Sequence, residues 1–328
     1  MTIKAIDLHA HWYPQEWIAL LEREGVRHGG QVTRQGGRIH VSGGGVANVI
    51  DESFIDLDLR LARMDAARVD LHVLSLTAPM VHWAPPQLSV ALAQCYNDAA
   101  SAAHRRHPTR FLGAATLPWQ APELAVRELE RCATLPGIRA VYCGTNINGT
   151  ELDDKSLWPI YAKAEALGWP ILLHPIRVIG PDRTERYYLK NLLGNPYDTG
   201  VAAAHLIFGG VLDDFPRLEV MLPHGGGTLT ALIGRMDHGT RVRPELKHMQ
   251  RMPSEYLRRF TYDTILHHDA LTTNLVRLVG ADRVTLGSDY CFDMGYEQPV
   301  EVIERLDLPA ADRALITGGN AARLLGLA

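Results

Sequence analysis

The chain has 328 residues, of which 46% are hydrophobic and 21% are charged, and its formal net charge is −4. This composition is that of an ordinary globular protein with a sizeable core, and it offers no basic surface for nucleic acid or an anionic membrane. The sequence contains no membrane-spanning apolar run and no recognisable secretory leader, and its four cysteines are scattered. We therefore expect a cytoplasmic protein with free thiols.

The first predicted strand, at residues 3–8, leads directly into His9-Ala10-His11. Because side chains alternate along a strand, both histidines face the same side and can share one metal ion. The alternative is a pair of buried, hydrogen-bonded histidines. Residues 15–24 have helical composition. The glycine-rich segment that follows predicts a small β-ribbon insertion at about residues 25–50, either as a lid over one end of the main body or as a solvated loop.

Helices and strands alternate from residue 56 onward. Helices are predicted at residues 56–67, 86–107, 121–134, 156–167, 199–212, 225–236 and 268–279. Strands are predicted at residues 69–76, 111–117, 138–143, 169–174, 218–224, 260–264 and 283–289. With the first strand this makes eight, which predicts an α/β fold: a (β/α)₈ TIM-like barrel with the ribbon inserted after strand one and a C-terminal helical cap. We expect a single domain over residues 1–328.

Candidate metal ligands stand at the carboxyl ends of the predicted strands. Strand one ends in His9 and His11, strand five in His174, strand six in His224 and strand eight in Asp289. In a parallel barrel all these ends lie on one rim, where active sites occur. Imidazole and carboxylate ligands suit Zn²⁺, with Mn²⁺, Fe²⁺ or Co²⁺ as alternatives. The sequence therefore predicts one divalent metal ion, with zinc favoured.

The motifs around these residues resemble those of the amidohydrolase superfamily, and most closely its branch that contains aminocarboxymuconate semialdehyde decarboxylase. They are Asp7-x-His9-x-His11, His174-Pro175, His224-Gly225-Gly226-Gly227 and Leu286-Gly287-Ser288-Asp289-Tyr290. The resemblance implies one metal held by His9, His11, His174 and Asp289, with His224 as the acid/base beside the bound water. No lysine stands at the end of strand four to hold a second ion, and no motif for an organic cofactor is found.

This ligand set suggests the chemistry. Loss of CO₂ from an unsaturated or aromatic acid needs a place for the electrons and a proton for the carbon, and a metal with an acid supplies both. We expect a metal-dependent, non-oxidative decarboxylase in which His224 and Asp289 are catalytic and a small carboxylic acid is the substrate. The alternatives are a hydrolase or hydratase for a lactone, amide or enol acid, and a metal-stabilised binding protein without turnover.

Three residues are candidates for binding the substrate. Arg235 matches an arginine that reaches the neighbouring subunit's site in the resembling decarboxylases, which implies a homodimer; a surface or interface salt bridge is the alternative. Arg177 and Trp12 are candidates by position alone, and Trp12 could instead simply pack.

Two departures from the resembling decarboxylase concern the substrate. Asn48 stands where that enzyme has a second substrate arginine, and Asn191 stands where it has a tryptophan. The missing arginine removes a clamp for a carboxylate. We therefore expect a substrate other than the muconate semialdehyde, either another carboxylated aromatic or a muconate- or lactone-like product of ring cleavage.

Overall fold

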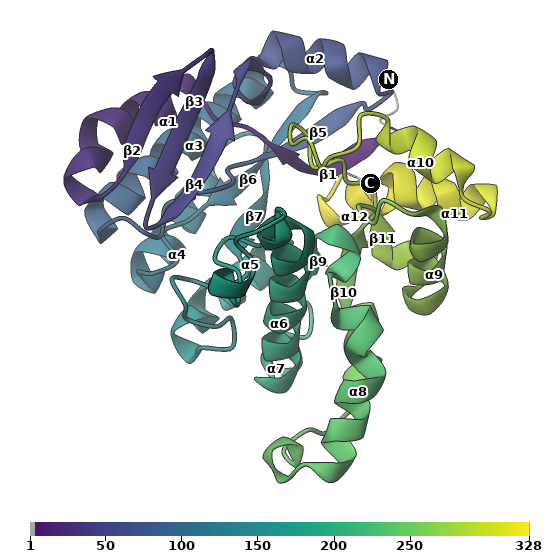
Figure 1. Cartoon of the computed structure of the whole chain (residues 1–328). Coiled ribbons are helices and arrows are strands. Elements are labelled where there is room, and N and C mark those ends of the chain that lie inside the picture. The colour runs from purple at the N-terminus through teal and green to yellow at the C-terminus, as the bar shows by residue number, and fades with distance from the viewer. Residues whose placement is uncertain (1–3, 328) are drawn as a thin grey trace.

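The computed structural model describes residues 4–327, and its centre is an eight-stranded parallel sheet rolled into a barrel (Figure 1). The strands follow one another around it in chain order: β1 (Ile6–His11), β5 (Leu71–Ser75), β6 (Phe111–Thr116), β7 (Ile138–Gly144), β8 (Ile171–His174), β9 (Val220–Leu222), β10 (Phe260–Asp263) and β11 (Val284–Thr285). Backbone hydrogen bonds from Leu8 N to Leu286 O (3.2 Å) and from Asp289 N to His9 O (2.9 Å) join the two edges. The predicted (β/α)₈ barrel is confirmed.

Helices surround the barrel. They are α2 (Leu57–Ala66), α3 (Pro86–Arg106), α4 (Pro122–Cys132), α5 (Trp158–Leu167), α6 (Asn195–Phe208), α7 (Val211–Asp214), α8 (Leu229–Val242) and α9 (Asp269–Val279). The C-terminal helices are α10 (Pro299–Arg305), α11 (Ala310–Ala314) and α12 (Asn320–Leu324). One apolar cluster fills the barrel interior and a larger one lies between strands and helices, as parallel strands buried on both faces require. Among the described residues, no helix is both long and apolar enough to cross a bilayer.

The glycine-rich insertion forms a separate antiparallel sheet of three strands: β2 (Gln31–Gln35), β3 (Arg38–Gly43) and β4 (Val46–Ile50). The third strand was not predicted, because its five residues follow a double glycine and lack clear alternation. The turn between β3 and β4 packs on the barrel: a Cβ at Gly43 would come within 2.2 Å of the Trp83 ring, so only glycine fits there. Val46 joins the apolar cluster inside the barrel.

Several boundaries differ from those predicted. Helix α1 (Gln15–Leu20) ends earlier than predicted, and residues Leu21–Gly25 form a π-helical turn. Strand β11 is much shorter than the predicted 283–289. Asp289 adopts a left-handed backbone conformation, with φ of 59°, so the chain leaves extended geometry before it. Helix α8 is longer than predicted and extends away from the barrel (Figure 1).

Candidate metal centre and active site

The structure brings the predicted strand-end residues together at one rim of the barrel. His9 and His11 come from β1, His174 ends β8, and His224 and Asp289 follow β9 and β11. His9 Nε2 lies 3.1 Å from His11 Nε2, so the two rings face the same side as strand alternation predicts. One donor atom from each of His9, His174, His224 and Asp289 lies within 4.8 Å of the other three.

The spacing of these atoms fits ligands around one ion. Asp289 Oδ1 lies 3.0 Å from His11 Nε2 and 3.3 Å from His9 Nε2. Two nitrogens that bind the same tetrahedral Zn²⁺ at 2.0–2.1 Å are separated by about 3.3 Å. Three imidazole nitrogens and a carboxylate oxygen are also the donor types that zinc and related divalent metals prefer. The residues present therefore fit a single divalent ion.

Hydrogen bonds at the opposite ring nitrogens orient three of the histidines. His9 Nδ1 lies 2.7 Å from Asp263 Oδ2, His11 Nδ1 lies 3.1 Å from Ser75 Oγ, and His174 Nδ1 lies 2.9 Å from Pro175 O. The Asp263 carboxylate and the Pro175 carbonyl accept a hydrogen bond from Nδ1. Ser75 Oγ can also accept one, because its own hydrogen is donated to Ala10 O. This arrangement leaves the Nε2 lone pairs directed at the centre of the cluster, as in established metal sites.

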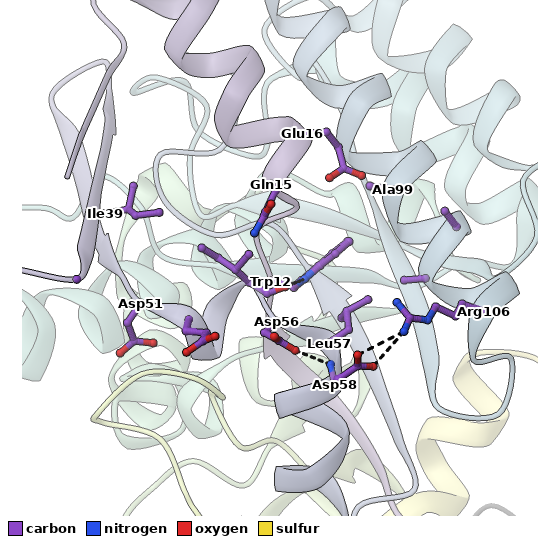
Figure 2. A pocket seen from close by; sticks show the side chains of 15 residues that line it. Trp12, Gln15, Glu16, Ile39, Asp51, Asp56, Leu57, Asp58, Ala99 and Arg106 are labelled. Atoms are coloured by element: carbon purple, nitrogen blue, oxygen red, sulfur yellow. Dashed lines mark hydrogen bonds and ion pairs between the residues drawn. The ribbon is translucent and has the colours of Figure 1, made fainter.

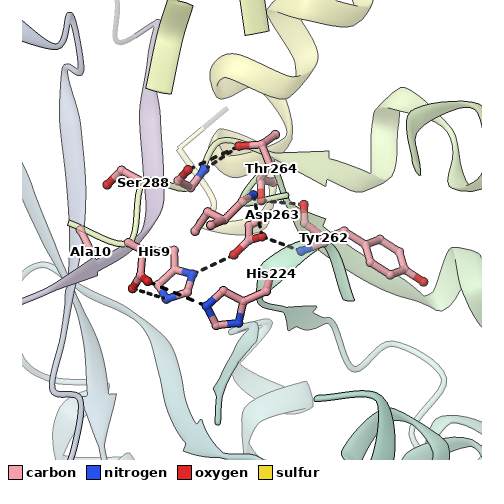
Figure 3. A network of polar contacts seen from close by, with 12 residues as sticks. His9, Ala10, His224, Tyr262, Asp263, Thr264 and Ser288 are labelled. Atoms are coloured by element: carbon pink, nitrogen blue, oxygen red, sulfur yellow. Dashed lines mark hydrogen bonds and ion pairs between the residues drawn. The ribbon is translucent and has the colours of Figure 1, made fainter. Parts of the chain in front are cut away.

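Asp263 is the functional residue that the sequence analysis missed. It ends β10, is fully buried, and its carboxylate is directed at the His9 ring with His224 nearby (Figure 3). Its second oxygen accepts from Gly225 N at 2.8 Å, so one carboxylate holds both His9 and the turn that carries His224. The position of Asp263 at the end of the seventh strand was the available signal.

Replacing Asp263 with asparagine should weaken metal binding about 10- to 100-fold while the protein stays folded, as is typical when a hydrogen-bond partner of a metal-binding histidine is changed. Competition with a chelator of known affinity measures the change. Asp269→Asn, at the exposed start of α9, is the matched control. Equal affinities of Asp263→Asn and wild type would show that the His9 contact does not support the metal.

The electrostatics of the cluster call for a cation. Burial lowers the pKa of His11 to about 4 and that of His174 well below its usual value, so both rings are neutral and able to bind a metal. Burial also acts to lower the pKa of His9, but Asp289 and Asp263 outweigh it and raise that pKa to about 10. The pKa of Asp289 is held well below its usual value against burial, chiefly by His9. The two buried carboxylates thus require a positive charge, which either protonated His9 or a divalent ion supplies.

His224 lies on the accessible side of the cluster. Its Nε2 is 3.9 Å from Asp289 Oδ2, and its side chain is 14% exposed, compared with 2% for His9 and 0% for His11. It has a left-handed backbone, with φ of 54°, and such strain in a non-glycine residue is concentrated at functional sites. The geometry thus offers five donors around one point, from His9, His11, His174, His224 and Asp289.

A buried arginine contacts the backbone at the end of β1. Arg60 of α2 is fully buried, its Nη2 donates to His11 O, and its Nη1 lies 3.3 Å from His72 Nδ1. Its guanidinium also lies 4.6 Å from the centre of the Tyr290 ring. Sequence reasoning could not find this contact, because it depends on how α2 packs beneath the strand ends.

The end of the fourth barrel strand, β7, carries no further carboxylate or lysine. The Tyr142 hydroxyl lies 3.4 Å from His11 Nδ1, whereas Cys143 belongs to the outer apolar cluster. Burial raises the pKa of the Cys143 thiol well above its usual value, which opposes the thiolate that a metal would bind. These positions fit a one-metal site.

The structure places the three candidate substrate residues outside the cluster. Arg235 is exposed on α8. Arg177 is exposed at the rim, where its Nη2 donates to Gly44 O of the ribbon at 3.3 Å. Trp12 is buried, and its Nε1 donates to Ile55 O at 2.9 Å. Their contacts with substrate stay predictions.

Trp12 also borders a hollow of about 570 Å³ between the ribbon, α2 and α3 (Figure 2). None of the residues lining this hollow belongs to the histidine cluster. Nearby Asn48 donates to the Tyr13 hydroxyl at 2.9 Å, and Asn191 lies in the helical turn Lys190–Gly194 after β8.

Comparison with known proteins gives the family. The amidohydrolase family matches residues 6–327. The chain belongs to this family. A relative from Dictyostelium discoideum, 2-amino-3-carboxymuconate-6-semialdehyde decarboxylase, is 37% identical, and the alignment covers 98% of this chain and 91% of the relative.

Solved structures that resemble this amidohydrolase include those of two aromatic acid decarboxylases. The 5-carboxyvanillate decarboxylase from Sphingomonas paucimobilis has a TM-score of 0.84 and 26% identity, with 100% of both chains covered. The dihydroxybenzoic acid decarboxylase from Polaromonas sp. JS666, with bound manganese and the inhibitor 2-nitroresorcinol, has a TM-score of 0.80 and 25% identity, covering 99% of this chain and 98% of that one.

Proposed function

We propose that this amidohydrolase is a metal-dependent, non-oxidative decarboxylase of an aromatic or unsaturated carboxylic acid. The observation that carries the proposal is the convergence of His9, His11, His174, His224 and Asp289 at one rim of the barrel, where His224 is the only one of the five that is not fully buried. A relative named as a decarboxylase, 37% identical over nearly the whole chain, supports the same reaction class.

The proposed ligands of a single divalent ion are His9, His11, His174 and Asp289. Support comes from the convergence of Nε2 atoms whose rings are fixed at Nδ1. Three imidazoles favour zinc, while the Polaromonas neighbour makes manganese the main alternative, and iron or cobalt also fit the donor types. When bound, such an ion polarises a substrate oxygen and lowers the pKa of a bound water.

His224 is the proposed proton carrier. Decarboxylation breaks the bond between a carbon and its carboxylate, releases CO₂ and leaves an electron pair on that carbon, which must then receive a proton. His224 can deliver this proton because it is partly exposed and its Nε2 faces Asp289. Asp289, whose low pKa keeps it charged, lies beside the His224 ring and is proposed to position it.

Recognition of the substrate carboxylate calls for a positive group, since a buried unpaired anion is costly. Arg235, on the α8 helix that projects from the barrel, is proposed to serve the neighbouring subunit of a homodimer (Figure 1). Arg177 and Trp12 are weaker candidates, since Arg177 holds the ribbon and Trp12 is packed. We also propose a cytoplasmic location, in keeping with four free cysteines.

Arg235→Ala should lower kcat/KM about 10- to 100-fold, the equivalent of losing a charged hydrogen bond worth about 1.5–3 kcal/mol. Hybrid dimers test whether the residue acts across subunits. Arg235→Ala and His224→Ala chains carrying different tags are co-expressed, and the mixed dimer is purified. If Arg235 acts in the partner's site, one site of the mixed dimer is intact and activity returns. An inactive mixed dimer places Arg235 in its own subunit's site and contradicts a role across the dimer.

The reaction class is tested by product analysis. Purified protein loaded with Zn²⁺ or Mn²⁺ is incubated with hydroxybenzoic acids, carboxyvanillate and muconate-type acids labelled at the carboxyl carbon. The proposal expects labelled CO₂ and a product one carbon shorter. Hydrated or ring-opened products without labelled CO₂ would instead support the hydratase or hydrolase alternative.

A further inference from the structure

His82 is a buried histidine that neither the metal site nor the proposed chemistry uses. It lies in the loop between β5 and α3 and is 5% exposed. Neither of its ring nitrogens has a hydrogen-bond partner among residues 4–327. Leaving buried polar atoms unpaired is costly, and native proteins usually satisfy them with protein, water or ligand. The ring therefore calls for a partner beyond the residues that the structure describes, such as water or a ligand.

The position of Gly144 locates His82 at the mouth of the barrel. A Cβ built on Gly144 would lie 3.3 Å from His82 Nε2, so the imidazole lies directly over this glycine. Tyr142, two residues earlier on β7, contacts His11 inside the barrel. Strand alternation places Gly144 on the same inward face, and Gly144 pairs in register with His174 on β8. His82 Nε2 is thus next to the rim position that carries a proposed metal ligand.

A small cavity lies against His82. Its walls include Asn148, Ile176 and Arg177, and it is closed on one side by Gly43 and Gly44 of the ribbon turn. Ile176 belongs to the apolar cluster inside the barrel, which places this wall at the barrel opening. The space is about 10 Å³, near the lower limit for one water molecule. It can therefore take a single oxygen atom but not a whole carboxylate.

We propose that His82 binds a hydroxyl substituent of the substrate and selects among hydroxylated aromatic acids. The inference rests on the proposed function for the substrate class. A neutral imidazole has one donor and one acceptor nitrogen, and a hydroxyl group, which also donates and accepts, can satisfy either of them. Burial lowers the pKa of His82 to about 4, which keeps the ring neutral near pH 7. A carboxylate, in contrast, accepts only and exceeds the space.

Ligand binding tests this without requiring turnover. The probes are 2-hydroxybenzoate and its 2,3-, 2,4-, 2,5- and 2,6-dihydroxy analogues, titrated calorimetrically into metal-loaded protein. Wild type should bind one dihydroxy isomer about tenfold more tightly than 2-hydroxybenzoate, the equivalent of one buried hydrogen bond. His82→Phe should bind that isomer and 2-hydroxybenzoate equally. His82→Gln, which keeps a donor and an acceptor, should restore part of the preference.

His107→Phe is the matched control. Its Nε2 is also buried without a partner among the described residues, but it lies between α3 and β6 at the opposite end of the barrel. It must leave the isomer preference unchanged. A preference that persists in His82→Phe, or a wild type with no preference because the cavity holds only water, overturns the proposal.

The failures of the two proposals are distinguishable. If His82 controls the binding preference but no acid releases CO₂, the proposed decarboxylase function fails and the role of His82 stands. If CO₂ is released while His82→Phe keeps the wild-type preference, only the role of His82 fails.

Discussion

Replacing His224 with alanine should leave metal content at the wild-type level and lower CO₂ release at least about 100-fold, the lower end of the range for removing a positioned acid or base. The metal should remain because His9, His11, His174 and Asp289 still converge on one point. The rate should fall because the proton for the carbon that loses CO₂ then comes from solvent. Metal analysis and single-turnover assays on the same preparation measure both quantities.

His238→Ala is the matched control for this variant. His238 is an exposed histidine on α8, so its removal should change neither metal content nor rate. A His224→Ala protein with wild-type activity would contradict the assigned proton role. A variant that instead loses its metal would make His224 a ligand, an arrangement that its place among the four converging donors also permits.

Asp289→Ala should abolish metal retention and, with it, activity. The carboxylate lies between His9 and His11, at 3.3 and 3.0 Å from their Nε2 atoms, and it also faces His224. Removing it takes away the only anionic member of the proposed ligand set. The loss of affinity should exceed the roughly 10- to 100-fold cost of changing a residue that merely hydrogen-bonds to a ligand. Equilibrium dialysis against buffered Zn²⁺ measures it.

The control for Asp289→Ala is Asp293→Ala, an exposed carboxylate four residues later on the same loop. It should keep one ion per chain. Full metal content in Asp289→Ala would contradict the proposed ligand set, whereas partial loss in both variants would point to a general disturbance of the loop. Circular dichroism of both proteins checks that the fold is retained.

The rim residues were predictable because a parallel barrel brings all carboxyl ends of its strands to one side. His9, His11, His174, His224 and Asp289 each stand at or just after such an end, so recognising the strands was enough to place them together. The detailed ligand geometry could not be predicted, because left-handed backbone at His224 and Asp289 sets the directions of both side chains.

The roles of Asp263 and Arg60 were not predicted, because their contacts join residues that are distant in sequence. Asp263 resembles any buried carboxylate until its distance to His9, 254 residues earlier, is known. The burial of Arg60 depends on the packing of α2 against β1. Trp12 and Arg177 lie beyond strand ends, where side-chain direction follows the loop and alternation no longer applies. Sequence position therefore could not show that their contacts are with Ile55 and the ribbon.

The most direct test of a metal-dependent decarboxylase is a titration of metal-free protein with Zn²⁺ or Mn²⁺ while CO₂ release from a carboxyl-labelled substrate is recorded. The rate should rise linearly with added metal from near zero and level off at one ion per chain. A rate that is already full in the metal-free protein, or that levels off only at two ions per chain, would contradict the proposed single-metal site.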